Sequence, residues 1–362
     1  MKISIDTLRL GALLLATAGS SGVAFAQKPP ATPADCRNIA ASMERLACYD
    51  AAVGRSETSA RESANPAAAP APGPVVSGDP AAAGTTLAAA GQAPSAPSII
   101  DATWGFDPAS PRYDISFHNS NYLLFGRYTD HVNNAPYMPL FQAAGQPQEN
   151  LNDIEAKFQI SFKARVWTTD DRRWGVWAAY TQQSQWQVYN GDVSRPFREN
   201  NYMPEVFVSY RPDVDLGGGF NWKLLNVGYN HQSNGRTDVL SRSWDRLFAT
   251  VGVERENLAL YATAWYRLPE SASQDDNPDI TDYYGYGELS ALYRWRGNSF
   301  KLSARGNVAT GKGSVQAGWF TPPLFGPLRG YVQVFSGYGE SLIDYNWNQT
   351  TVGAGIALND GF

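Results

Sequence analysis

Three side chains that could act together in nucleophilic hydrolysis lie in "NVGYNHQSNGRTDVLSRSWDRLFATVGV", residues 226 to 253. His231 and Ser233 are two residues apart, and Asp245 follows in the second half of the segment. A serine hydroxyl becomes a nucleophile when a base accepts its proton, and a histidine base needs a third group to fix its tautomer. The three residue types therefore favour Ser233 as nucleophile, His231 as base and Asp245 as the orienting acid.

The residues around this group alternate as they do in half-buried β-strands. One face of the first run carries large apolar residues together with the candidate pair: Leu225, Val227, Tyr229, His231 and Ser233. The other face carries small or polar residues: Asn226, Gly228, Asn230 and Gln232. The next run places on one face Asp245, Leu247, Ala249, Val251 and Val253. Because side chains alternate strictly along a strand, the three candidates are expected on the apolar face.

Similar alternating segments recur through the rest of the chain, separated by loops that contain Asn, Asp, Gly and Pro. Twelve are expected, near 121–129, 153–165, 173–185, 203–211, 219–231, 243–253, 257–267, 283–294, 299–309, 314–321, 329–338 and 350–361. Long and short connections alternate between them, and the chain ends on Phe362. Aromatic residues make up 13% of the chain, which suits the aromatic girdles of membrane barrels.

These features together predict an all-β fold, a twelve-stranded antiparallel transmembrane β-barrel in the bacterial outer membrane, over residues 99–362. A soluble β-sandwich would explain the alternation alone. An ionisable group on the lipid-facing wall of a barrel costs about 2–4 kcal/mol at the bilayer midplane and less near the interface. A chain does not ordinarily keep His231, Ser233 and Asp245 together on such a wall for packing, so we interpret them as a site.

The N-terminal part of the chain is predicted to contain three further segments. Residues 1–26 have a basic residue, an apolar run and a final Ala-Phe-Ala, which is typical of a cleaved secretory signal peptide. Residues 27–56 are expected to form a short helical segment in the periplasm. Residues 57–98 are dominated by Ala, Pro, Gly and Ser, and we expect a disordered linker. The net charge of −5 and the lack of a basic stripe favour no nucleic-acid partner.

Cys36 and Cys48, both in the helical segment, are the only cysteines of the chain. Export makes a disulfide plausible, but a straight helix would separate the two residues by about 18 Å. A disulfide needs α-carbons within roughly 7 Å. Either the helix breaks into a hairpin and the bond forms, or the bond is absent; we favour the bridged hairpin. The remaining histidines, His118 and His131, have no comparable serine and carboxylate nearby and are expected to be solvated loop residues.

The segment "YNHQSNGRTDVLSRSWDRL" resembles the active-site segment of the outer membrane phospholipase A family. The similarity extends from about Asn121 to Phe362 and includes "SRPFRENNY", "DDNPDITDYYGY" and "VFSGYGESLIDYNWNQT". It implies a twelve-stranded barrel, Ser233 and His231 in the roles given above, and a contribution of the Gly235 backbone N–H to the oxyanion hole. One position departs from the pattern, because the best-known member has asparagine where this chain has Asp245.

The resemblance also implies a calcium cofactor. The positions that match its ligands in the dimer are the Arg236 carbonyl, the Ser241 hydroxyl and the carbonyl of Ser194 of the partner subunit. A further calcium position in the monomer maps to Asp276. Oxygen ligands of this kind suit a hard cation.

The resemblance finally implies an enzyme that acts on membrane lipid as a homodimer. The expected function is calcium-dependent hydrolysis of acyl esters at sn-1 and sn-2 of glycerophospholipids and lysophospholipids. Tyr180, Gln182 and Trp186 form a candidate part of the dimer interface, since Gln182 matches an interface glutamine of the family. The alternatives are a passive porin-like barrel, which would carry its functional residues in the lumen, and a catalytically silent structural homologue.

Overall fold

The computed structural model contains two compact units, Met1–Ala88 and Ala89–Phe362. The residues that the structure describes are Thr32, Cys36, Cys48, Ala52, 98–143, 151–192 and 195–361. Cys36 and Cys48 form a disulfide, with their α-carbons 5.7 Å apart, as the bridged alternative requires. The signal peptide, the helical fold of the disulfide-bonded segment and the linker lie outside the described residues.

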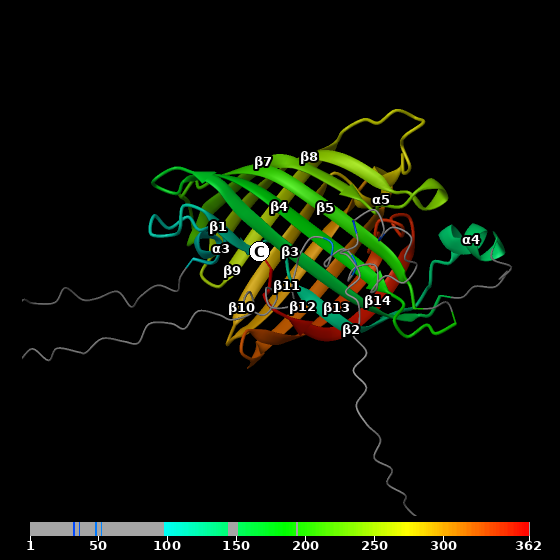
Figure 1. Cartoon of the computed structure of the whole chain (residues 1–362). Coiled ribbons are helices and arrows are strands. Elements are labelled where there is room, and N and C mark those ends of the chain that lie inside the picture. Colours follow the sequence, from blue (N-terminus) through cyan, green and yellow to red (C-terminus); the bar gives the residue numbers. More distant parts are fainter. Residues whose placement is uncertain are drawn as a thin grey trace, which may run out of the picture. The chain divides into compact units, whose positions relative to one another are not determined.

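The second unit is a β-barrel in which each strand pairs with antiparallel neighbours (Figure 1). Its twelve strands are β2 (Tyr122–Thr129), β3 (Ile154–Thr168), β4 (Trp174–Trp186), β5 (Phe197–Tyr210), β7 (Phe220–Ser233), β8 (Ser243–Arg255), β9 (Leu258–Arg267), β10 (Gly287–Trp295), β11 (Asn298–Asn307), β12 (Lys312–Phe325), β13 (Leu328–Tyr338) and β14 (Asn348–Ala357). The last strand pairs with the first, from Thr351 opposite Thr129 to Ala357 opposite Tyr122, and so closes the barrel. The predicted twelve-stranded barrel is confirmed.

Two short strands, β1 (Asp114–Phe117) and β6 (Val214–Gly217), also pair with barrel strands but do not count as additional strands of the barrel. β1 pairs with β3 beyond the part of β3 that pairs with β2. β6 pairs with the start of β7, where β5 has already ended. Each is therefore the continuation of a bent strand. Four predicted boundaries were wrong by four residues or more. β5 begins at Phe197, β12 continues to Phe325, and β14 ends at Ala357. The start of the expected strand 283–294 belongs to helix α5 (Ile280–Tyr284).

The other helical elements of the described chain are short. They are α3 (Ile99–Trp104), the 3₁₀ helix η2 (Ala135–Tyr137), α4 (Met138–Ala143) and the 3₁₀ helix η3 (Asp238–Leu240). None of the helices in the described ranges is long and apolar enough to cross a membrane. Figure 1 shows α3 at one end of the barrel, with α4 and α5 at the other.

Residues 98–106, which we call the plug segment, fill the barrel at the end with short connections. Ser98 caps α3 by accepting a hydrogen bond from the backbone of Asp101, and Gly105 ends the helix in a left-handed conformation at φ 58°. Ile99, Ile100, Trp104 and Phe106 are buried in one cluster with lumen-facing residues of the strands, among them Trp177, Leu224 and Tyr261. The Ile100 backbone N–H donates to Glu254, and Asp101 pairs with Arg211 and Lys223. The plug segment is thus part of the barrel core.

A truncation series tests where the dispensable N-terminal region ends. We expect that a signal peptide fused directly to Ser98 gives a barrel that assembles and keeps the full specific activity expected from the sequence. The reason is that His231, Ser233, Asp245 and the predicted calcium ligands all lie beyond Ser98. Deletion through Phe106 should instead lower the temperature at which the barrel loses its heat-modifiable mobility in gels, since each fully buried large apolar side chain contributes about 1.5–3 kcal/mol. Equal midpoints for the two truncations would show that the plug segment contributes nothing to stability.

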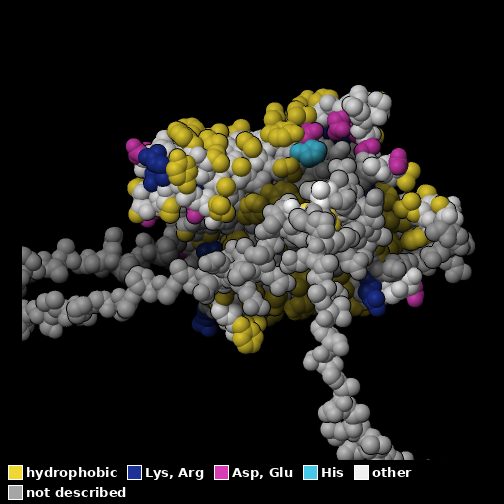
Figure 2. All heavy atoms as spheres, viewed as in Figure 1, with side chains coloured by type: hydrophobic (Ala, Val, Ile, Leu, Met, Phe, Trp, Pro, Cys, Tyr) yellow, Lys and Arg dark blue, Asp and Glu magenta, His cyan; other side chains and the backbone are white. Residues whose placement is uncertain are grey.

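The two faces of the strands differ as the alternation predicts. On β7, Val227 and Tyr229 are 54% and 40% exposed, whereas Asn226 and Asn230 are 4% and 1% exposed. Leu247 on β8 is 49% exposed. Figure 2 shows hydrophobic side chains spread over the outer surface of the strands. The outer wall is therefore apolar, and the inner faces of the strands carry polar residues beyond the cluster around the plug segment, as a barrel in lipid requires.

Candidate active site

His231 and Asp245 meet on the outer wall. They occupy directly opposite positions on the neighbouring strands β7 and β8. The ring Nδ1 of His231 and the Oδ1 atom of Asp245 are 2.8 Å apart, a hydrogen-bond distance. The two side chains keep 36% and 30% of their surface exposed, so the pair lies at the surface and not in the lumen. This is the contact expected of a base and the group that fixes its tautomer.

Ser233 is the last residue of β7 and shares the outer face with His231. Residues two apart along a strand have α-carbons about 6.5 Å from each other, which lets the imidazole lean towards the hydroxyl. Within the described residues no hydrogen bond joins the two side chains, and the Nε2 atom of His231 has no other hydrogen-bond partner. Catalytic hydrogen bonds are often long before substrate binds. The arrangement therefore leaves Nε2 available to Ser233.

A tyrosine that the sequence analysis did not single out belongs to the same group. Tyr229 precedes His231 by two residues on the same face, and its hydroxyl donates to Oδ1 of Asp245 at 2.6 Å. The same carboxylate oxygen thus accepts from Tyr229 and contacts His231. The only feature of the sequence that pointed to Tyr229 was its place on the same strand face as His231 and Ser233.

The loop after Ser233 is held by a buried asparagine that was also missed. Asn234 is 2% exposed, and its Oδ1 atom accepts from the backbone N–H groups of Arg236 and Arg242 at 3.2 and 3.0 Å. Its Nδ2 atom donates to the Leu240 carbonyl at 2.7 Å. One side chain therefore ties three points of the loop to the end of β7.

Gly235 adopts a conformation that other residues rarely take. Its φ is +61°, and a Cβ atom there would lie 3.0 Å from the ring of Tyr202. A residue with a side chain would be strained by the backbone angle and crowded by the ring. The position following Asn234 therefore requires glycine, with its backbone N–H close in sequence to Ser233.

Two of the predicted calcium ligands contact each other directly. The Ser241 hydroxyl donates to Oδ2 of Asp276 at 2.5 Å, joining the loop after β7 to the loop after β9. The neighbouring acids Asp275 and Asp279 are engaged elsewhere, with Arg267 at 2.6 Å and the Tyr345 hydroxyl at 2.7 Å. The three acids of this loop thus have different partners, and the carboxylate that contacts Ser241 is that of Asp276.

The remaining predicted calcium ligands are Arg236 and Ser194. Arg236 lies in the same loop as Ser241, whereas Ser194 falls outside the described residues. Across the described ranges, no three His, Cys, Asp or Glu residues gather as a metal site would need. The candidate donors are a hydroxyl, a carboxylate and a backbone carbonyl, all oxygen atoms, which is the donor chemistry that calcium takes.

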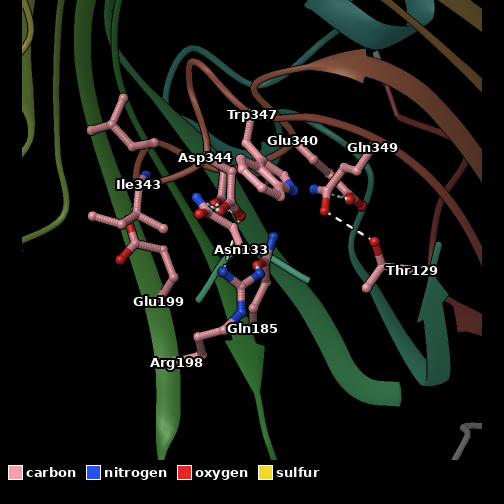
Figure 3. Close-up of polar contacts among 12 residues, drawn as sticks. Thr129, Asn133, Gln185, Arg198, Glu199, Glu340, Ile343, Asp344, Trp347 and Gln349 are labelled. Carbon is pink, nitrogen blue, oxygen red and sulfur yellow. Dashed lines mark hydrogen bonds and ion pairs between the residues drawn. The ribbon is translucent and has the colours of Figure 1, made fainter. Parts of the chain in front are cut away.

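The loop between β13 and β14 contributes two acids, Glu340 and Asp344, to a separate polar cluster in the lumen (Figure 3). Glu340 pairs with Arg127 and with Lys157, the latter at 2.9 Å. Burial would raise the pKa of Glu340, but Arg127 and Lys157 lower it to about 2. Asp344 accepts from Arg198 at 3.0 Å and from Asn133 at 2.9 Å. Each of these acids contacts at least one cation, and the contacts tie the loop to β2, β3 and β5, which favours a structural role.

His118 and His131 were both expected to be solvated loop residues, which was wrong for His118 and correct for His131. His131 is exposed beside Asp130, as a solvated loop histidine should be. His118 is not solvated: its ring stacks on Phe207 at 5.7 Å, and its Nε2 atom lies 2.8 Å from Glu205. It sits where the chain bends between β1 and β2, so the bend turns it into the lumen.

Comparison with known proteins identifies the family. The sequence model described as Phospholipase A1 matches residues 107–358. The chain is 42% identical to the phospholipase A1 of Escherichia coli K12 over 250 residues, which are 68% of this chain and 81% of that protein. It is 40% identical to a putative phospholipase A1 of Neisseria meningitidis over 67% of this chain and 65% of the relative, slightly less than two thirds of its length.

The chain belongs to the phospholipase A1 family.

Solved structures of the phospholipase A1 family agree with this assignment. The chain matches the outer membrane phospholipase A of Escherichia coli with a TM-score of 0.63 and 38% identity, over 68% of this chain and 99% of that one. It matches a Salmonella typhi outer membrane phospholipase dimer with bound calcium with a TM-score of 0.65 and 37% identity, over 73% and 98%. The resemblance, the expected class of enzyme and the outer-membrane location are confirmed.

Proposed function

We propose that this member of the phospholipase A1 family cleaves the acyl esters of glycerophospholipids and lysophospholipids with Ser233, His231 and Asp245 as its catalytic group. The observation that carries the proposal is the His231–Asp245 contact at 2.8 Å on the apolar outer wall, with Ser233 on the same face. A site of this chemistry facing lipid fits an ester held in a membrane. Hydrolysis at both sn-1 and sn-2 is part of the proposal.

The reaction is an acyl transfer in two halves. Oγ of Ser233 attacks the ester carbonyl carbon while Nε2 of His231 takes the hydroxyl proton, and Asp245 holds the opposite ring N–H and stabilises the imidazolium. The oxyanion accepts a hydrogen bond from the Gly235 backbone N–H. The carbon–oxygen bond to the glycerol then breaks, and His231 returns the proton to the leaving alcohol. Water then attacks the acyl carbon while His231 takes its proton, and His231 returns that proton to Oγ of Ser233 as the fatty acid leaves.

The position of the group along the strand supports an ester substrate from the outer leaflet. Ser233 ends β7 on the side of the long loops, and outer-membrane barrels place their long loops outside the cell. The ester bonds of a lipid lie at the boundary between acyl chains and headgroups. Val227 and Leu247 continue the outer wall deeper into the apolar layer, where acyl chains would lie.

Calcium fits the oxygen donors beside the catalytic loop. In the dimer, Arg236 through its carbonyl and Ser241 through its hydroxyl would hold the ion, together with the carbonyl of Ser194 of the partner subunit. Asp276 would supply its carboxylate to the further position of the monomer. When bound there, calcium would polarise the ester carbonyl and balance the oxyanion charge. The contact between Ser241 and Asp276 supports the proposal, because it brings together the two loops that carry these positions.

Dimer formation through β4 is part of the same proposal. Tyr180, Gln182 and Trp186 lie partly exposed on the outer face of this strand. The amide of Gln182 contacts the Tyr180 hydroxyl at 3.3 Å and the Ser184 hydroxyl at 3.1 Å. A polar group kept on a lipid-facing wall is a candidate for pairing with a second copy, and the Salmonella typhi relative is a dimer.

Chelation tests the calcium requirement. We expect that excess chelator reduces hydrolysis of a micellar phospholipid to background and that added calcium restores it. Ser241→Ala should raise the calcium concentration for half-maximal activity roughly tenfold, because one ligand is removed. Ser336→Ala, on the outer face of β13, is the matched control and should leave it unchanged. Activity that is unaffected by excess chelator would contradict the calcium proposal.

The two ester positions are separated by substrate design. Lipids with a non-hydrolysable ether at sn-1 or at sn-2 each leave one cleavable ester, and we expect fatty-acid release from both. Release from the sn-1 ester alone would restrict the activity to phospholipase A1. No release from either, by folded protein with calcium present, would favour the silent homologue.

A further inference from the structure

Tyr229 contacts the candidate orienting acid from the side opposite the long loops. Along β7 the outer face carries Tyr229, His231 and Ser233 in that order, and Asp245 lies opposite His231 on β8. The Tyr229 hydroxyl is 2.6 Å from the same Oδ1 atom that His231 contacts. The carboxylate is thus held between an imidazole and a phenol.

An acid on a lipid-facing wall needs such a donor. A carboxylate in water is satisfied by solvent, whereas one facing apolar surroundings must find hydrogen bonds within the protein. Within the described ranges, Asp245 has no Lys or Arg partner, and its one ion-pair contact is His231. Glu270, in the loop after β9, adds negative charge nearby. Tyr229 therefore supplies the only side-chain donor, apart from His231, that the described residues give this carboxylate.

We propose that Tyr229 is a positioning residue that fixes the Asp245 carboxylate and, through it, the imidazole of His231. The inference rests on the proposed triad and adds a fourth member to it. With Oδ1 held from two directions, the acid cannot rotate away from His231 without breaking the tyrosine hydrogen bond. The ring of Tyr229 is 40% exposed and lies two residues before His231 on the outer face of β7.

Removal of the hydroxyl tests the proposal. Tyr229→Phe keeps the ring on the outer wall, so the barrel should assemble with unchanged heat-modifiable mobility. We expect kcat on a micellar ester to fall about three- to tenfold, the equivalent of one net hydrogen bond. KM should stay unchanged, because the hydroxyl acts on Asp245 and not on the lipid. Tyr266→Phe, at an exposed position of β9 opposite Leu247, is the matched control and should retain full kcat.

A double-mutant comparison separates positioning from general stability. Hydrogen bonds to a charged acceptor are about twice as strong as neutral ones, so Tyr229→Phe in the Asp245→Asn background should reduce kcat only about two- to threefold. The same fold loss in both backgrounds, or no loss in the wild-type background, would overturn the role of Tyr229.

Ser233→Ala, measured in the same assay, distinguishes failure of the positioning role of Tyr229 from failure of the proposed function. Full turnover by Ser233→Ala would refute the triad itself. An inactive Ser233→Ala together with an unaffected Tyr229→Phe would refute only the positioning role.

Discussion

Replacement of Ser233 by alanine is expected to reduce ester hydrolysis by at least about 10³-fold while the barrel still folds. The hydroxyl is the atom that bonds to the acyl group in the proposed reaction. Turnover of a micellar ester by purified protein, with heat-modifiable mobility as the test of folding, gives the result. Ser336→Ala, on another strand of the outer wall, should behave as wild type.

Replacement of His231 by alanine is expected to have an effect of the same size. Without the imidazole, neither the attack by Ser233 nor the departure of the alcohol has a proton carrier. The matched control is His131→Ala, because that histidine is exposed beside Asp130 and far along the chain from the site. Near-wild-type turnover in folded Ser233→Ala or His231→Ala would remove the triad assignment.

A further large effect is expected at Asp245, where two substitutions should differ. Asp245→Asn keeps an oxygen that can accept from His231 and should retain substantial activity. Asp245→Ala removes the acceptor, and the loss should be far larger, because loss of the triad acid costs about 10⁴-fold in subtilisin. A partly exposed site tolerates more, so we expect the order wild type, Asn, Ala.

The pH dependence of the Asp245 variants carries additional information. The carboxylate shares its surroundings with His231, Tyr229 and Glu270, and replacing it by a neutral amide removes the charge that favours the imidazolium. The acid limb of activity should therefore change in Asp245→Asn. Turnover measured across a wide pH range, with dimer formation followed by crosslinking, tests this. If Asp245→Ala equals wild type, another residue orients His231.

The strand pattern made most of the barrel predictable. Alternation with a period of two assigns every residue of β7 and β8 to a face, so the meeting of His231 and Asp245 on the outer wall followed from the sequence once the hairpin was assumed. The segment 283–286 was misread because its tyrosines suit strands as well as helices. Asp279 precedes the short helix α5 there.

The contacts that were missed share one physical reason. His118 meets Glu205, which is 87 residues away, across the lumen, and a local pattern contains no information about such partners. Asn234 reads as an ordinary loop residue, yet its burial and three backbone contacts depend on how the whole loop folds. Tyr229 was assigned to the correct face, but face assignment alone does not reveal which hydroxyl reaches Asp245.

The plug segment at one end and the loop between β13 and β14 at the other have a consequence for the cell's permeability. An ion crossing the barrel would have to displace Trp104 and its apolar neighbours, then separate Glu340 from Arg127 and Lys157. The protein is therefore expected to be electrically silent in planar bilayers. A cell can keep many copies without leakage, and the only hazard of abundance is the hydrolysis of its own lipids, which makes control at the outer wall essential.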